Sequence, residues 1–215
     1  MSLAVLLAHG SPDPRSALAV RAAAAAVEVL LGGARVEVAF LDHDRATLAD
    51  VVGDAPEGHE VTVLPLLLSR AFHARVDVPA AVAGLARPVR LLEPLGHPAP
   101  LLDALLRPLA GPVIVVAAGT KVDDERAAFQ AAVADASDRT GIAAHAAFAT
   151  GPGPALAESL TPGAQVVPWL LAPGRLLDLV HTTATPHQVI GAGLLTEPLL
   201  LDLLTTRLHD ADPFH

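Results

Sequence analysis

The sequence predicts an α/β protein built from two similar lobes, each a parallel sheet flanked by helices. Two observations lead to this fold class. Short aliphatic runs alternate with longer helical patterns along the 215 residues, which favours parallel strands joined by helices that cover both faces of the sheet. The pattern also restarts halfway, because VLLAHGS at residues 5–11 aligns with IVVAAGT at residues 114–120. Such internal similarity indicates a duplicated unit.

The elements of the first half follow from local patterns. A continuous apolar run that ends at a loop is typical of a strand buried on both faces, and residues 3–8 form such a run. Short, mainly aliphatic stretches predict further strands at residues 36–41, 61–68 and 89–92. The segments between the strands predict helices over residues 16–31, 45–52, 76–85 and 99–109. Pro65 has no amide hydrogen for a β ladder, so the third strand is expected to end or to bulge near it.

The duplication is supported by four matches that occur in the same order in both halves. After the first, VAFLD at 38–42 corresponds to AAFAT at 146–150, VLPLLL at 63–68 to VVPWLL at 166–171, and LLEPL at 91–95 to LLTEPL at 194–199. The sequence therefore predicts an N-terminal lobe over residues 1–110 and a C-terminal lobe over residues 111–215. A small ligand is expected in a cleft between such lobes.

Composition excludes several classes of partner and site. The formal net charge of −9 argues against nucleic acid or an anionic membrane surface as the partner. Cysteine is absent, so any transition-metal site must use histidines and carboxylates. No apolar run approaches the roughly 20 residues of a membrane span, and the N-terminus lacks the basic region and cleavage site of a signal peptide. We therefore expect a cytoplasmic protein with no membrane contact, and a monomer because the duplication already supplies two lobes.

Two histidines follow neighbouring strands in the first half and are missing from the second. His9 aligns with Ala118, and His73 aligns with Leu176. The carboxyl ends of parallel strands meet at one edge of a sheet, where open α/β sheets bind ligands. Either histidine alone would equally fit a structural role. The pair, present in only one copy of a duplicated scaffold, predicts metal binding or proton transfer.

A carboxylate after the second strand completes a candidate metal site. Asp42 is expected at the same edge, with His43 beside it. Together, His9, Asp42 and His73 form a nitrogen and oxygen ligand set suited to a divalent first-row metal, with positions open for another ligand. Asp42 would equally serve as a cap of the next short helix. The sequence leaves open whether Asp42 or His43 completes the site.

Further residues near this edge are candidates for binding an anionic substrate. Gly10 permits a sharp turn, and Ser11 and Asp13 are placed to cap the helix that follows, whose N-terminus would favour an acidic group. Arg15, Arg70 and Arg75 are basic residues in an otherwise acidic chain and are placed to receive carboxylates. Each arginine alone also fits an ordinary solvated side chain.

Three segments resemble the sirohydrochlorin chelatases of the CbiX/SirB type: LLAHGSPDPR near the N-terminus, VAFLD, and VTVLPLLLSRAFHARVDVP. The resemblance covers nearly the whole chain, since the long form of that family is itself a duplicated two-lobe α/β protein. It implies insertion of Co²⁺ or Fe²⁺ into a tetrapyrrole, sirohydrochlorin, without ATP and without an organic cofactor. This step belongs to cobalamin or siroheme biosynthesis.

The resemblance also implies roles for individual residues. His9 and His73 take the positions of the two family histidines that bind the incoming metal, and Asp42 lies near the acidic position, which is often Glu. The segment before the second histidine usually contains Gly, whereas this chain has Ala71 and Phe72. Retention of both histidines favours an enzyme. The altered segment favours a non-catalytic protein that binds or carries a metal or a tetrapyrrole, and the missing signal peptide disfavours a periplasmic-type metal-binding protein.

Overall fold

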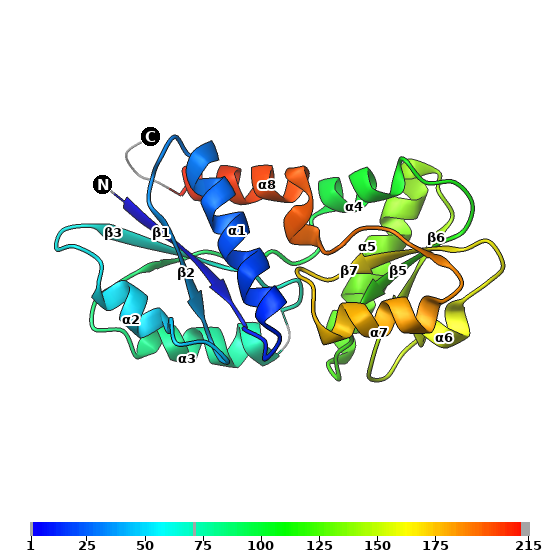
Figure 1. The fold of residues 1–215 in the computed structure, drawn as a ribbon, viewed down its shortest axis with the longest axis horizontal. Helices are drawn as coiled ribbons and strands as arrows, with labels where there is room; N and C mark the ends of the chain where they lie inside the picture. Colours follow the sequence, from blue (N-terminus) through cyan, green and yellow to red (C-terminus); the bar gives the residue numbers. More distant parts are fainter. Residues whose placement is uncertain (1, 71, 212–215) are drawn as a thin grey trace. The chain divides into compact units, whose positions relative to one another are not determined.

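Two four-stranded parallel sheets, each flanked by helices, form the core of the protein (Figure 1). The structure is a computed structural model that describes residues 2–70 and 72–211. The predicted α/β class is therefore confirmed, whereas Ala71 lies outside the described residues. None of the described helices is both long enough and apolar enough to cross a membrane.

Each repeat contributes its elements in the same order. The first repeat forms β1 (Ser2–Ala8), α1 (Pro14–Leu30), β2 (Val36–Phe40), α2 (Leu48–Gly53), β3 (Glu60–Pro65), the π-helical turn η1 (His73–Asp77), α3 (Val78–Ala83), β4 (Arg90–Leu91) and α4 (Ala99–Leu106). The second repeat forms β5 (Val113–Ala117), α5 (Asp123–Thr140), β6 (Ala144–Phe148), α6 (Leu156–Ser159), β7 (Gln165–Trp169), α7 (Arg175–Ala184), β8 (Gln188–Val189), the 3₁₀ turn η2 (Leu194–Thr196) and α8 (Pro198–His209).

The strand order is the same in both sheets, which supports the duplication. It is β2-β1-β3-β4 in one sheet and β6-β5-β7-β8 in the other. In the first sheet, Ala8 pairs with Phe40 of β2 and Leu7 pairs with Pro65 of β3. The central strands β1 and β5 lie where the direction of the crossovers reverses. Their carboxyl ends therefore border the switch points at which open α/β sheets bind ligands.

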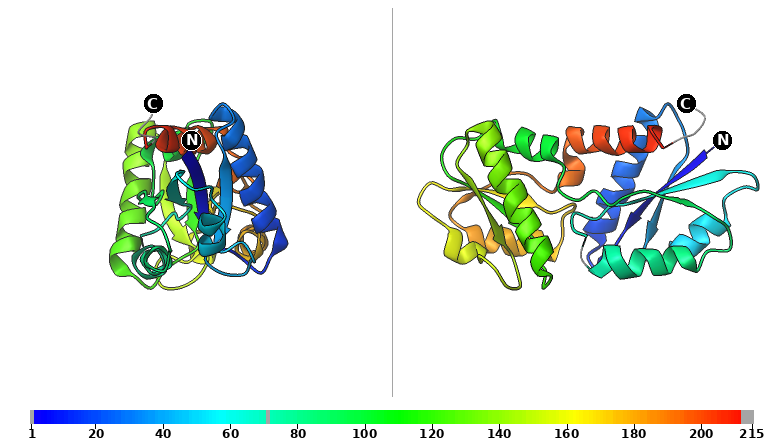
Figure 2. Two further views of the ribbon diagram at one scale, coloured as in Figure 1. Left: turned by 90° about the vertical axis from the view of Figure 1, so that its left-hand side faces the viewer. Right: turned by 180° about the vertical axis from the view of Figure 1, so that it is seen from behind.

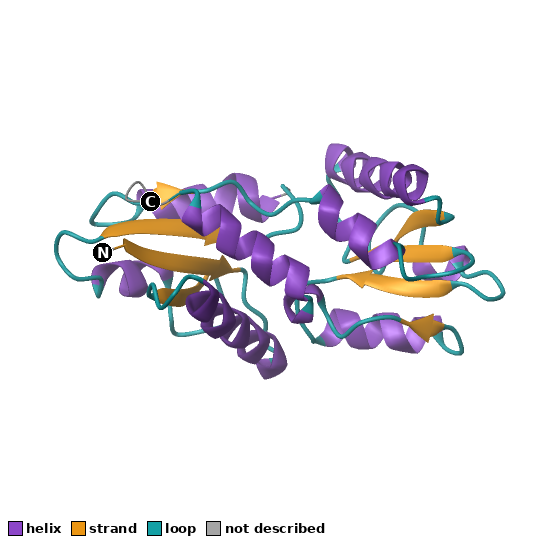
Figure 3. Ribbon diagram, turned by 90° about the horizontal axis from the view of Figure 1, so that it is seen from above, coloured by secondary structure: helices purple, strands orange, loops and turns teal. Residues whose placement is uncertain are grey.

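β1 is buried on both faces because its side chains alternate between two layers of helices. Leu3, Val5 and Leu7 belong to a core cluster that includes Leu48 of α2 and Val78 at the start of α3. Figure 3 shows helices on both sides of each sheet. This double burial explains why β1 is read from the sequence as an uninterrupted apolar run.

The helix after β3 begins earlier than the sequence predicts. Pro65 is the last residue of β3, in agreement with the expectation that the strand ends near it. The helical segment then starts with the π-helical turn η1, in which the amide of Val78 donates to the carbonyl of His73, five residues back. His73 therefore lies in the first turn of a helical segment. Single π-helical turns of this kind are frequently found at functional sites.

The compact units of the structure differ from the sequence repeats by an exchange of their last helices. One unit comprises Met1–Leu95 and Leu195–His215, and the other comprises Gly96–Leu194. α8 packs on α1 and α4 packs on α5, as the views in Figures 1 and 2 show. The exchanged helices are held by buried leucines, namely Leu200, Leu204 and Leu208 of α8 and Leu101, Leu102 and Leu106 of α4. The predicted division near residue 110 separates the repeats, whereas the compact units are interleaved in sequence.

Candidate metal-handling site

His9 and His73 lie together at the carboxyl edge of the first sheet. His9 directly follows β1, and His73 begins η1 after the neighbouring strand β3. Their ring centroids are 4.0 Å apart, with an angle of 60° between the ring planes. The structure therefore brings the two predicted histidines together at the switch point of the sheet. Two imidazoles this close can bind one divalent metal ion or exchange a proton with one ligand.

The turn that presents His9 depends on Gly10. Gly10 has a φ of 95°, and a Cβ atom there would lie 1.8 Å from the carbonyl oxygen of Asp42. The close approach arises because the amide of Asp42 donates to the carbonyl oxygen of His9, at 2.9 Å. Only glycine combines this φ with this approach.

The second repeat builds the same turn without a histidine. Gly119 has a φ of 106°, and its Cβ position lies 1.9 Å from the carbonyl oxygen of Thr150. The amide of Thr150 donates to the carbonyl oxygen of Ala118 at 3.0 Å, as Asp42 does to His9. The imidazole of His9 is therefore not required for the turn.

Each imidazole of the pair is held through its Nδ1 atom. Nδ1 of His9 lies 3.0 Å from the carbonyl oxygen of Gly10, and Nδ1 of His73 lies 2.5 Å from Oδ2 of Asp77. Both acceptors are oxygens without a hydrogen, so a hydrogen bond at either contact requires the proton on Nδ1. The lone pairs for a metal are then on the Nε2 atoms. Asp77 is not among the residues predicted from the sequence, although its spacing of four residues from His73 places both on one face of a helix.

Asp42 does not join the two histidines in a three-ligand cluster. Its side chain is 64 % exposed, its Oδ1 accepts from the amide of His43 at 2.7 Å, and its Oδ2 lies 3.4 Å from Nε2 of His43. The His43 ring is 6.4 Å from that of His9, and His43 has a φ of 63°. Within residues 2–70 and 72–211, no group of three or more His, Cys, Asp or Glu residues is arranged to hold a metal ion. The carboxylate of Asp42 is directed to its neighbour along the chain instead.

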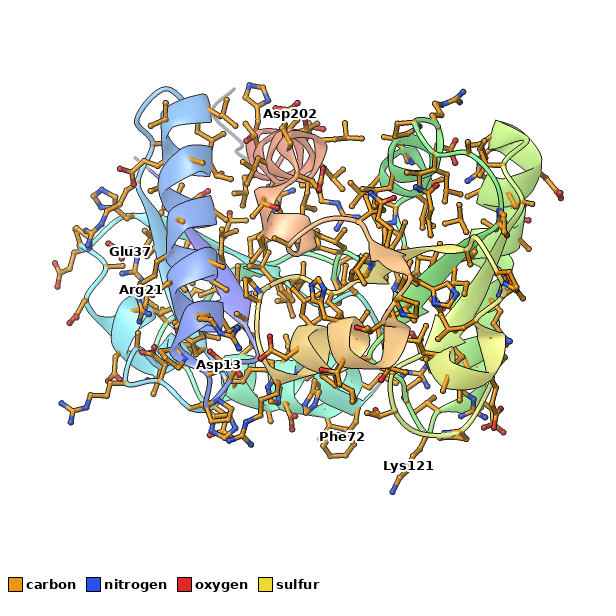
Figure 4. The ribbon with its side chains drawn as sticks, turned by 45° about the vertical axis from the view of Figure 1, so that its right-hand side comes forward. Asp13, Arg21, Glu37, Phe72, Lys121 and Asp202 are labelled. Carbon is orange, nitrogen blue, oxygen red and sulfur yellow. The ribbon has the colours of Figure 1, made fainter. Side chains whose placement is uncertain are left out.

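Ser11 and Arg15 are engaged in the local structure that starts α1. The Ser11 hydroxyl accepts from the amide of Asp13 at 3.1 Å, and Asp13 in turn caps the helix by accepting from the amide of Arg15. The guanidinium of Arg15 also pairs with Asp13, at 2.6 Å. Figure 4 shows Asp13 at the start of α1. The predicted cap of α1 is thus Asp13, with Ser11 supporting it.

The other predicted arginines lie on exposed segments after β3. Arg70 pairs with Glu93 at 3.4 Å, and Arg75 is an exposed residue of η1. Exposed ion pairs of this kind contribute about 1 kcal/mol or less. A multiply charged anionic ligand can therefore displace Glu93 from Arg70 at little cost.

An exposed aromatic side chain stands next to the histidine pair. Phe72 is 59 % exposed, and its ring centroid lies 6.0 Å from that of His73. Its ring extends away from the ribbon in Figure 4. The remaining aromatic side chains of the described residues are buried, namely Phe40, Phe129, Phe148 and Trp169. Phe72 thus offers an apolar ring face beside the two imidazoles.

Another histidine, His97, is partly buried in the second unit and has a different environment. The indole Nε1 of Trp169 donates to Nδ1 of His97 at 3.2 Å, and the ring of Phe129 lies 5.1 Å away. Burial lowers the pKa of His97 from its ordinary value of 6.5, and the nearby carboxylate of Glu125 opposes this shift only in part. The neutral ring is needed here, because an imidazolium has no lone pair to accept the indole hydrogen.

We expect the free energy of unfolding to fall as the pH drops below about 6.5 through the titration of His97. The unfolded chain binds a proton there at a higher pH than the folded chain, so acidification favours unfolding. Urea denaturation followed by the fluorescence of Trp169, the single Trp of the sequence, measures this dependence. His97→Gln keeps an acceptor for the indole but does not titrate, and it should weaken the dependence. An unchanged pH dependence in that variant would remove His97 as its source.

Comparisons with known proteins place the chain in a family. The family model CbiX matches residues 3–110. No sequence among the curated proteins matches the chain.

Solved structures share the whole fold. SirB from Bacillus subtilis with Fe³⁺ has a TM-score of 0.75 and 19 % sequence identity, covering 98 % of this chain and 95 % of its own. CbiX, described as the terminal enzyme for biosynthesis of siroheme in denitrifying bacteria, has a TM-score of 0.75 and 21 % identity, covering 99 % and 100 %. A multi-domain protein from Deinococcus radiodurans with structural similarity to chelatases has a TM-score of 0.69 and 19 % identity, covering 95 % of this chain and 54 % of its own. With the sequence match and the shared fold together, the chain belongs to the CbiX family.

Proposed function

We propose that this protein inserts a divalent metal ion, Co²⁺ or Fe²⁺, into sirohydrochlorin without ATP or an organic cofactor. The observation that carries the proposal is the His9–His73 pair, whose ring centroids are 4.0 Å apart at the switch point of the first sheet. The pair occurs in only one of the two repeats, so it is not a requirement of the scaffold. The names of the similar structures, SirB with Fe³⁺ and a CbiX of siroheme biosynthesis, agree with this reaction.

The chemistry of the pair suits metal insertion. The macrocycle releases two pyrrole protons for each divalent ion that enters, so the site must deliver a metal and accept protons. Neutral imidazoles bind first-row metals and take up protons near neutral pH. Two imidazole ligands leave most of the coordination positions of the metal open to the pyrrole nitrogens. Thiolates would bind a soft ion more tightly, and the chain has no cysteine.

The surroundings of the pair suit a tetrapyrrole with acidic arms. The exposed ring of Phe72 lies beside His73 and can pack on the face of the macrocycle. Arg15, Arg70 and Arg75 are assigned to the carboxylate arms, since guanidinium groups bind carboxylates through paired hydrogen bonds. Asp42 and His43 are the candidates for a further metal ligand once the metal is bound. We propose that the reaction takes place in the cytoplasm and that the protein acts as a monomer.

An anaerobic absorbance assay tests this proposal. Purified protein is mixed with sirohydrochlorin and either Co²⁺ or Fe²⁺, and the spectral change of metal insertion is followed over time. We expect an initial rate proportional to the protein concentration and well above the rate without protein. A rate equal to the background, together with measurable binding of metal or tetrapyrrole, would make the protein a carrier instead.

A further inference from the structure

Asp77 contacts the imidazole of His73 and does not cap a helix. Its Oδ2 lies 2.5 Å from Nδ1 of His73, four residues earlier in η1. Although Asp77 directly precedes α3, its side chain makes no capping hydrogen bond to that helix. The two side chains are 35 % and 49 % exposed, so the contact is not a buried ion pair that the core would require. Neither a capping role nor core packing therefore accounts for the carboxylate.

The second repeat lacks this carboxylate as well as the histidine. Its corresponding helix, α7, begins as an ordinary α-helix with Leu176 in the position of His73. Leu179 and Val180 are aliphatic where Asp77 would fall. The corresponding helix thus forms without a carboxylate at this position, and the carboxylate occurs only in the repeat that carries the imidazole.

We propose that Asp77 is a positioning residue that holds His73 in the tautomer with the proton on Nδ1. Free imidazole side chains in water favour the proton on Nε2, whereas a carboxylate at hydrogen-bond distance from Nδ1 reverses this preference. The lone pair is then on Nε2, where it can bind the metal. A carboxylate behind a metal-binding histidine also fixes the orientation of the ring, and its removal typically lowers metal affinity about 10- to 100-fold.

The inference depends on the proposed function, because His73 needs a defined tautomer only if it binds the metal. It adds a residue outside the pair of histidines, at the end of the same turn η1 that His73 begins. His9 has a weaker equivalent, since its Nδ1 lies 3.0 Å from the neutral carbonyl oxygen of Gly10. The shorter contact of His73, 2.5 Å to a carboxylate oxygen, makes it the better fixed of the two imidazoles.

The test reads the tautomer of His73 directly. In protein with ¹⁵N-labelled histidine at alkaline pH, where unperturbed imidazoles are neutral, proton–nitrogen correlation spectra distinguish the two tautomers. We expect the Nδ1–H form of His73 in the wild type and the Nε2–H form in Asp77→Ala. Co²⁺ affinity, measured by calorimetry without tetrapyrrole, should fall about 10- to 100-fold in the same variant.

Matched variants separate positioning from a structural role. Asp77→Asn keeps an oxygen that accepts from Nδ1, so it should restore the tautomer and part of the affinity. Asp77→Leu copies the aliphatic side chains of the second repeat and should fold but behave like Asp77→Ala. Asp50→Ala removes a carboxylate that binds the Thr47 hydroxyl at 2.6 Å in the same unit, and it should leave His73 unchanged.

The outcomes distinguish this inference from the proposed function. An unchanged His73 tautomer in both Asp77→Ala and Asp77→Leu would overturn the positioning role, whatever the insertion assay gives. In another outcome, the wild type shows the Nδ1–H form of His73 and the Asp77 variants lose Co²⁺ affinity, but the wild type inserts no metal. That result would support the positioning role of Asp77 and overturn only the proposed chelatase activity.

Discussion

Replacing His9 or His73 with alanine is expected to lower the rate of metal insertion by about 100-fold or more. Each substitution removes a metal ligand and a proton acceptor, and general acid–base contributions alone are worth about 10²- to 10⁴-fold. The fold should tolerate both changes, since Ala118 and Leu176 occupy the equivalent positions of the second repeat. The measurement is the initial rate of Co²⁺ insertion into sirohydrochlorin, alongside the midpoint of thermal unfolding.

The matched control is a histidine outside the site. His145 is exposed on β6 of the second unit, so His145→Ala should keep the wild-type rate. If His9→Ala and His73→Ala both retain full activity with intact folds, the metal-handling site has been assigned to the wrong residues. If these variants lose activity and their thermal unfolding midpoints also fall strongly, the two histidines have a structural role instead.

Gly10→Ala is expected to destabilise the protein by about 3 kcal/mol and to reduce activity with it. The added Cβ would lie 1.8 Å from the carbonyl oxygen of Asp42, and the residue would also have to keep a φ of 95°. Relief of the clash requires the turn after β1 to separate from the end of β2. His9 would then move away from His73, so insertion should slow even in the fraction that remains folded. Chemical denaturation and the insertion rate together measure both effects.

Substitutions of two other glycines separate the cost of the Cβ clash from the cost of the positive φ and from the displacement of the histidines. Gly119→Ala meets the same obstacle, 1.9 Å from the oxygen of Thr150, and should destabilise the protein comparably without displacing the histidines. Gly32 has a φ of 69° but nothing within 4 Å of its Cβ position, so Gly32→Ala should cost only about 1 kcal/mol. If Gly10→Ala and Gly32→Ala lower the free energy of unfolding equally, the close approach of Gly10 to Asp42 has no energetic effect.

The parts of the fold that depend on local pattern could be predicted from the sequence. The run at residues 3–8 that forms most of β1 is apolar throughout because both sheet faces are covered. The stretch VLLAHGS has its counterpart in IVVAAGT because the scaffold is duplicated. His9 and His73 stand out in the sequence because the second repeat has Ala118 and Leu176 at the equivalent positions.

Features that depend on tertiary structure could not be predicted in this way. The exchange of α4 and α8 between the units is decided by which core their leucines fill, and both helices have similar apolar patterns. The π-helical turn includes a hydrogen bond from the amide of Val78 to the carbonyl of His73, a five-residue spacing that the sequence does not indicate. The contact between His97 and Trp169 joins residues 72 positions apart. Asp77 is the exception, because its spacing of four residues from His73 is visible in the sequence and would place both side chains on one face of a helix.

The identity of the residues that hold the metal is tested most directly by titrating Co²⁺ into the wild-type protein with ¹⁵N-labelled histidines. The paramagnetic ion shifts and broadens the ring signals of the histidines that bind it, and no tetrapyrrole is required. Of the ten histidines in the sequence, His9 and His73 should be affected first and together, at about one equivalent of metal. Their Nε2 signals should be affected most. Saturation of other histidines while these two remain unchanged would contradict the assignment of the metal to this pair.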